Sequence, residues 1–247
     1  MSFVVLFVIL GAAAAGFAQG LSGFAFAMIA MSFWAWVLEP TTAAVMTVTC
    51  SVVGQLMTIK SARAGFDFKR ILPFVLGGLI GVPMGAAILP LIDQTMFRLI
   101  LGAFVLSWSS TMLLAGHRWT LKAENRAADA GIGVVGGVMG GIGGLAGAVP
   151  TLWCSLKSWD KNAQRAVIQT FNLTMHTVTL TAYVAGGLIT TATTQWLALA
   201  VPAMLIPSFI GNRLYNRISD AAFRRLVLIL LLISGTTLLT TSLAALI

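Results

Sequence analysis

Long runs of apolar residues, interrupted only by short polar loops, fill nearly the whole chain. They cover residues 2–38, 41–59, 71–91, 95–116, 130–156, 166–191, 195–211 and 226–247. Runs of this length can cross about 30 Å of hydrocarbon as helices and are too long for membrane strands. Because only helices and closed barrels satisfy backbone polar groups in lipid, the pattern predicts an all-α polytopic membrane protein.

Composition supports one integral membrane domain over residues 1–247. The chain is 58% hydrophobic and only 9% charged, whereas soluble domains carry about 25% charged residues and need them to cover a water-facing surface. The net charge of +8 is spread over short loops, so we interpret it as a signal of orientation and expect no nucleic-acid partner. Cys50 and Cys154 lie inside apolar runs and are expected to be buried rather than part of a disulfide framework.

The chain resembles itself at a distance of about half its length. Gly16, Gly20 and Gly23 recur 121 residues later as Gly137, Gly141 and Gly144. A second block recurs 126 residues later, with Gly85, Ile88, Ile92, Phe97 and Arg98 matching Gly211, Leu214, Ile218, Phe223 and Arg224. Such duplication, with conspicuous glycines in so apolar a chain, indicates a transporter whose site lies between two related halves. We assign the repeats to residues 2–116 and 128–247.

Basic residues in the loops predict how the segments are threaded, because cytoplasmic loops are enriched in Lys and Arg. The loops at 60–70, 116–129, 157–165 and 213–225 are basic, whereas those at 91–98 and 190–194 are not. All four basic loops are cytoplasmic only if residues 130–156 enter the membrane and return to the same side. The length and central glycines of 2–38 predict a second such hairpin.

Each half then comprises a glycine-broken or re-entrant hairpin followed by three transmembrane helices. Three is an odd number, so the two halves are inverted relative to each other, and both termini are predicted on the outer, periplasmic side. Two short crossings in place of each re-entrant hairpin would be compatible with the same loop charges. Inverted repeats with interrupted helices are a known plan of membrane transporters.

The glycines of the hairpins predict a binding site. Between residues 131 and 147 there are nine glycines, a density that allows close helix approach and also lets the chain unwind before Pro150. Unwound backbone at bilayer depth is tolerated where it lines a wet cavity, and a half-helix that begins there directs free N–H groups at a small anion. The alternative is that the glycines only form a tight packing face between helices.

Polar residues near the two breaks are candidate substrate-binding groups. Gln169, Asn172 and His176 follow helical spacing and can share one face, and Thr47 aligns with Gln169 when the helices after the two hairpins are superimposed. The Ser and Thr hydroxyls could instead bond back to their own helices. The candidate set is Gln19, Gly20, Ser22, Gly23, Thr47, Thr49, Ser51, Gly143, Gly144, Thr151, Gln169 and Asn172.

His176 is a titratable residue expected near mid-membrane, and it is the candidate for proton coupling. The alternative is a neutral histidine that is hydrogen-bonded to a neighbouring helix. The sequence holds no Walker motif, no His-Glu-x-x-His and no Cys-x-x-Cys, so we expect no catalytic residues, no metal site and no cofactor.

Two glycine-rich series carry a family resemblance. The run Gly16-Phe-Ala-Gln-Gly-Leu-Ser-Gly23 leads into an apolar stretch that ends at Glu39-Pro40, and Gly140-Gly-Ile-Gly-Gly144 is followed by Val149-Pro150. With the duplication and the length, these series resemble the sulfite exporter TauE/SafE family, also called the toluene-sulfonate uptake permease group, over essentially the whole chain. The first half departs from the proline-bearing motif, since Ile29 stands opposite Pro150.

The resemblance implies a secondary transporter in the bacterial inner membrane for small sulfur-containing anions such as sulfite, sulfoacetate or another organosulfonate. It maps the family's glycine breaks onto Gly20, Gly23, Gly143 and Gly144. We expect alternating access, compatible with coupling to H⁺ or Na⁺ and with a homodimer. A passive small-anion channel is the alternative, and a membrane-embedded enzyme or assembly subunit is disfavoured because no acidic partner is expected beside the central histidine.

Overall fold

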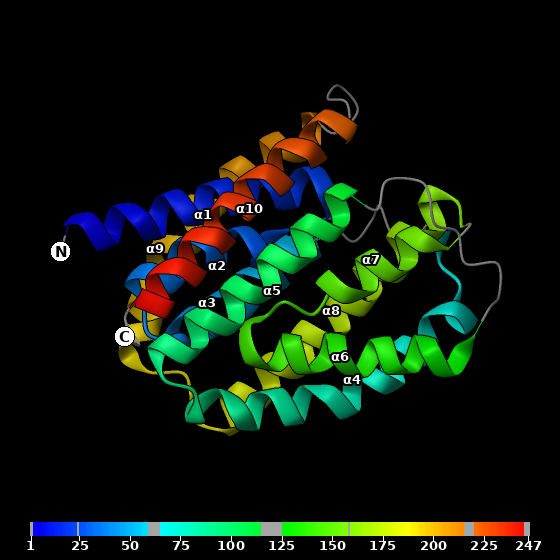
Figure 1. The fold of residues 1–247 in the computed structure, drawn as a ribbon, viewed down its shortest axis with the longest axis horizontal. Helices are drawn as coiled ribbons and strands as arrows, with labels where there is room; N and C mark the ends of the chain where they lie inside the picture. Colours follow the sequence, from blue (N-terminus) through cyan, green and yellow to red (C-terminus); the bar gives the residue numbers. More distant parts are fainter. Residues whose placement is uncertain are drawn as a thin grey trace.

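The computed structural model describes residues 2–23, 25–58, 65–114, 125–157, 159–214 and 220–244. These residues form helices joined by short connections, so the all-α prediction is confirmed for them (Figure 1). The helices are α1 (Ser2–Ser22), α2 (Phe26–Val37), α3 (Pro40–Thr58), α4 (Phe68–Ile88), η2 (Leu89–Leu91), α5 (Gln94–Leu114), α6 (Arg126–Gly143), α7 (Ala148–Leu156), α8 (Lys161–Ala185), α9 (Thr191–Leu214) and α10 (Asp220–Ala244).

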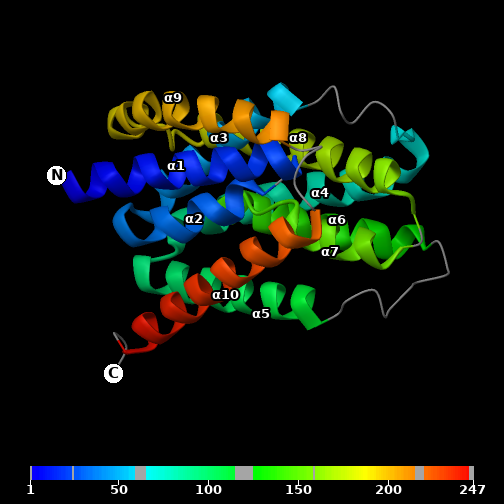
Figure 2. The same ribbon diagram turned by 90° about the horizontal axis from the view of Figure 1, so that it is seen from above.

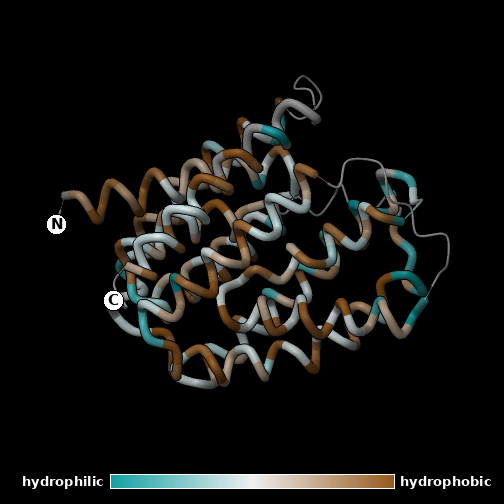
Figure 3. Tube along the Cα trace, viewed as in Figure 1, coloured by the Kyte–Doolittle hydropathy of each residue, from teal (hydrophilic) through white to brown (hydrophobic). Residues whose placement is uncertain are grey.

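Five of the described helices, α1, α3, α4, α5 and α9, are long and apolar enough to cross a membrane. The helix α8 has 25 residues and does not join this group, because polar side chains such as Gln169, Asn172 and His176 lower its hydropathy. Figure 3 shows hydrophobic residues along most helices, with hydrophilic residues gathered mainly near the helix ends. Cys50 and Cys154 are buried and free, as the apolar runs predicted.

Both predicted hairpins are broken at a glycine with left-handed backbone. Gly23, with φ of 83°, follows α1, and Gly144, with φ of 72°, ends α6. At the second break the Gly144 N–H bonds to Gly140 O and the Leu145 N–H bonds to Met139 O, which is the pattern of a helix stop that glycine favours because it has no Cβ. The return arms α2 and α7 have 12 and 9 residues.

Other glycines bring helices of the two halves into close contact. The helix α1 packs along α9, α6 packs along α4, and α5 packs along α10, and Figure 2 shows α1 beside α9. A Cβ on Gly20 would meet Ser208 O, and a Cβ on Gly141 would meet Val82 O. The glycines therefore have two roles: some allow close packing of backbones, and Gly23 and Gly144 allow the turns.

A tryptophan closes each hairpin. Trp34 of α2 donates its indole N–H to Val8 O of α1 at 3.2 Å, and Trp153 of α7 donates to Asp129 Oδ1 of α6 at 2.6 Å. Val8 and Asp129 lie 121 residues apart, which is also the spacing of the hairpin glycines. Each short return arm is therefore fastened to its long arm at a corresponding place.

The helix ends fall into two groups. In Figures 1 and 2 the starts of α4, α6 and α8 and the ends of α5 and α7 lie toward one end of the molecule, on the right. The start of α1, the end of α10 and the connections α4–α5 and α8–α9 lie toward the other end. The basic segments near Lys69, Arg126 and Lys157 thus share one end of the molecule.

Candidate functional site

The turn of each hairpin contacts the helix that follows the other hairpin. A Cβ on Gly144 would lie 3.0 Å from Thr47 Cγ2 of α3, and a Cβ on Gly23 would meet Gln169 Nε2 of α8. Thr47 and Gln169 are the positions that align between the two halves. Because α3 and α8 pack against each other, both hairpin turns border one central region.

Buried polar residues lie along one face of α3 and one face of α8, two helices that pack against each other. On α3 they are Thr47, Ser51 and Gln55, four residues apart, and on α8 they are Gln169, Asn172, His176 and Thr179; all are at most 3% exposed. Spacings of three and four residues place each set on one helix face. The two helices therefore bring a group of polar side chains into the interior of a largely apolar bundle.

Several atoms of this central polar cluster have no partner among the described residues. They are Thr47 Oγ1, Ser51 Oγ, Gln55 Nε2, both amide atoms of Asn172, His176 Nδ1 and Thr179 Oγ1. A buried polar group without a hydrogen bond is costly, and such groups in native proteins are normally satisfied by water or a ligand. The cluster thus offers both donors and acceptors to a small polar guest.

Asn172 lies against the start of α7. A Cβ on Gly147, the N-cap residue of α7, would meet the Asn172 amide, and the cap makes no side-chain hydrogen bond. A helix start carries unsatisfied N–H groups and a partial positive charge. In the first turn of α7 the Ala148 N–H already bonds to Leu145 O and Pro150 has no N–H. The Asn172 amide and the partial positive charge of the helix start are therefore what this place offers to an oxyanion.

Side-chain hydrogen bonds hold the two turns. Gln19 Nε2 donates to Gly23 O at 3.1 Å, and Gln19 Oε1 accepts from Phe26 N at 3.2 Å. In the second hairpin, His176 Nε2 lies 2.7 Å from Gly144 O. Gln19 therefore positions the start of α2 with its own hydrogen bonds, and His176 holds the corresponding turn from a neighbouring helix.

The remaining predicted residues are spread more widely. Gly20 lies against α9, and Gly143 is the last residue of α6. The hydroxyls of Ser22 and Thr49 donate to Ala18 O and Val45 O of their own helices, which is the alternative considered for such residues. Thr151 is half-buried, and its hydroxyl has no partner among the described residues.

Three charged residues of the segments that were expected to be loops lie within the helices or at their ends. Lys157 donates to both carboxylate oxygens of Asp129, at 2.6 and 2.8 Å, and each residue is 5% exposed. Arg165 stands one turn before Gln169 on α8 and is half-buried. Arg165 lies four residues before Gln169, and Thr179 lies three residues after His176. These helical spacings could have placed both residues on the same face of α8 as the predicted polar residues.

Comparison with known proteins agrees with this architecture. No curated protein and no solved structure matches the chain. A family model described as sulfite exporter TauE/SafE matches residues 8–238, nearly the whole chain. The match and the apolar helices identify a multi-pass membrane protein. The chain belongs to the sulfite exporter TauE/SafE family.

Proposed function

We propose that the protein is a secondary transporter that moves a small sulfur-containing anion, such as sulfite, sulfoacetate or another organosulfonate, across the bacterial inner membrane by alternating access. The observation that carries this proposal is the group of buried, unpartnered polar atoms between α3 and α8, next to the start of α7. Membership of the sulfite exporter TauE/SafE family supports the substrate class.

Neutral donors bind the anion in this proposal. The Asn172 amide and the hydroxyls of Thr47 and Ser51 can donate hydrogen bonds, and the start of α7 adds the dipole of its backbone. Neutral donors hold an anion less tightly than a buried ion pair would, which suits a substrate that must also be released.

The two halves are proposed to be inverted repeats. Reciprocal packing supports this proposal, because Gly20 lies against Ser208 and Gly141 lies against Val82. Gly141 is the repeat counterpart of Gly20, and Ser208 is the repeat counterpart of Val82. The return arms α2 and α7, with 12 and 9 residues, are too short to cross about 30 Å of hydrocarbon, which favours re-entrant hairpins.

The way in which the hairpins are attached supports a proposal of alternating access. Each hairpin packs along a helix of the other half, giving one unit of α1, α2 and α9 and a second unit of α4, α6 and α7. We expect these units to tilt about α3 and α8, which would open the central polar cluster first to one side and then to the other. Proton coupling is assigned to His176, whose Nδ1 is an acceptor within the cluster.

Transport in proteoliposomes tests the proposal. The substrates are sulfite, sulfate, thiosulfate, sulfoacetate, taurine and simple carboxylates, each with and without imposed H⁺ or Na⁺ gradients. We expect accumulation of a sulfur oxyanion above its external concentration and loss of that uptake in Asn172→Ala. Thr49→Ala is the matched control, because its hydroxyl bonds back to α3. Equilibration without accumulation would indicate a passive channel, and unchanged uptake by Asn172→Ala would reject the assigned site.

A further inference from the structure

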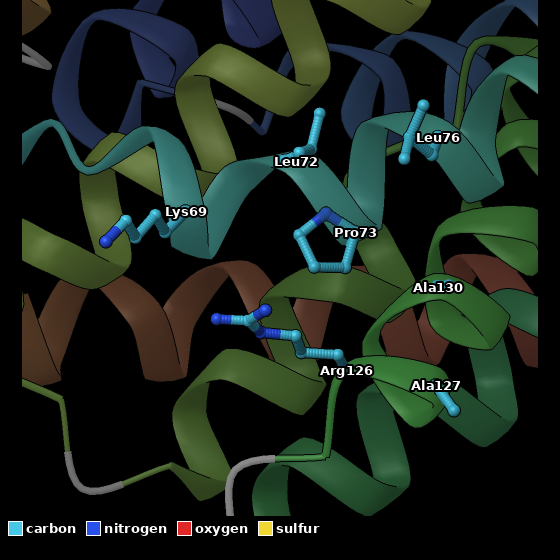
Figure 4. Close-up of a pocket in the computed structure, with 7 residues that line it drawn as sticks. All are labelled: Lys69, Leu72, Pro73, Leu76, Arg126, Ala127 and Ala130. Atoms are coloured by element: carbon cyan, nitrogen blue, oxygen red, sulfur yellow. The ribbon is translucent and has the colours of Figure 1, made fainter.

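We propose that a groove between the starts of α4 and α6 binds an anionic phospholipid, with the lipid phosphate held between Lys69 and Arg126. The groove has a volume of about 580 Å³ and opens on the outer surface of the bundle, away from the central polar cluster. Leu72, Pro73 and Leu76 of α4 and Ala130 of α6 line its apolar part (Figure 4). The inference does not depend on the transported substrate.

The charged end of the groove is suited to a phosphate group. Lys69 and Arg126 are both exposed, and Figure 4 shows their cationic groups pointing toward the same side of the groove. Among the described residues, the acidic side chains nearest to them in sequence are already paired, Asp67 with Arg70 and Asp129 with Lys157. Glu124, two residues before Arg126, lies outside the described residues. The two cations also lie at helix starts, where the backbone adds partial positive charge.

The rest of the groove is suited to an acyl chain. Leu72 and Leu76 are exposed by 36% and 54% and lie one helical turn apart, and they line the groove together with the small side chains of Ala127 and Ala130. From Lys69 to Leu76 the helix rises by about 10 Å, so the apolar surface continues directly from the charged end. A free phosphate ion would leave that surface uncovered, whereas a phospholipid matches both parts.

The position of the groove fits a headgroup site at a membrane boundary. Basic pockets between transmembrane helices on the cytoplasmic side are suited to acidic lipid headgroups, and each Lys or Arg near an anionic surface contributes a factor of about five in binding. Two cations thus predict a preference of about 25-fold for an anionic over a zwitterionic lipid. A lipid bound here would bridge α4 and α6.

Lipid binding to the purified full-length protein tests this inference. Native mass spectrometry would compare phosphatidylglycerol with phosphatidylcholine for the wild type, for Lys69→Gln/Arg126→Gln and for Arg213→Gln. Arg213 is the matched control, because it is an exposed cation in the last turn of α9. We expect the wild type and Arg213→Gln to prefer phosphatidylglycerol strongly over phosphatidylcholine. In the double variant this preference should fall by at least fivefold. Inorganic phosphate should not compete.

A second measurement keeps the wild-type cations. The wild type contains seven tryptophans, so the readout is the quenching of Leu76→Trp beyond that of the wild type. This additional quenching by brominated acyl chains should be larger when the chains belong to phosphatidylglycerol than to phosphatidylcholine. Equal quenching by the two lipids would overturn the proposal. So would an equal loss of the phosphatidylglycerol preference in Arg213→Gln and in the double variant, or competition by inorganic phosphate.

Discussion

The imidazole Nε2 of His176 lies 2.7 Å from the carbonyl oxygen of Gly144, where α6 stops. A carbonyl oxygen can only accept a hydrogen bond, so Nε2 carries the proton, and Nδ1 of the neutral ring is left as an acceptor. Nδ1 is buried and has no partner among the described residues. One side chain thus holds the second hairpin turn and also presents a proton acceptor to the central polar cluster.

Substitutions at His176 separate these two roles. His176→Gln retains a donor that can reach Gly144 O, so we expect a folded protein whose uptake no longer responds to a pH gradient. His176→Ala also removes the bond to the turn and should lower stability by about 1–3 kcal/mol. Thermal unfolding and gradient-driven uptake in vesicles measure the two effects. Unchanged pH dependence in His176→Gln would reject the proton relay.

The ion pair between Lys157 and Asp129 should be important for stability. Removal of one partner leaves the other charge buried and alone, which typically costs about 3–5 kcal/mol. We therefore expect Lys157→Met to lower the thermal stability markedly and Asp129→Asn/Lys157→Met to regain much of the loss. Unfolding of the detergent-solubilised variants provides the comparison. If both single and double variants match the wild type, the pair has no structural role.

Gly144→Ala tests whether the second turn also needs space. The left-handed backbone costs a residue with a Cβ about 1–2 kcal/mol, and the new Cβ would lie 3.0 Å from Thr47 Cγ2. Gly187→Ala is the control, because its φ is 67° and a Cβ there would meet nothing within 4 Å. We expect similar losses of stability but a loss of transport in Gly144→Ala only. Equal transport by the two variants would show that the contact with Thr47 is unimportant.

Cysteine accessibility tests the inverted arrangement. Phe68 at the start of α4 and Thr194 near the start of α9 are exposed and lie 126 residues apart. In inverted halves, Phe68→Cys should react from the cytoplasmic side and Thr194→Cys from the periplasmic side. The native cysteines are buried and give a low background. Labelling of both positions from one side would mean that the halves run parallel.

Much of the helical architecture was predictable because lipid restricts the choices available to the backbone. Apolar runs marked the helices, and the glycine-rich segments that hold Gly23 and Gly144 marked the regions of the two breaks. The predicted bounds of α8 were less accurate. The expected run began at residue 166, whereas α8 begins at Lys161, because the polar residues of its first turn belong to the helix and Asp160 caps it.

The residues of the candidate site were predictable where helical spacing places them on one face. They were less predictable where their place depends on packing between segments that are distant in the sequence. Gln169, Asn172 and His176 share a buried face, as their spacing indicated. The sequence could not distinguish the glycines that turn the chain from those that allow close packing, because both roles need the same absent side chain. The burial of Lys157 was equally hidden, since its partner Asp129 lies 28 residues earlier.

The partnership of α1 with α9 has a consequence for biogenesis. The N-terminal helix is synthesised first, yet the surface that receives its glycines arrives only with residues 191–214. Until then, the backbone at Gly16 and Gly20, which packs against Met204 and Ser208 of α9, has no partner helix. The close packing of the first helix is therefore completed only after most of the polypeptide has been synthesised.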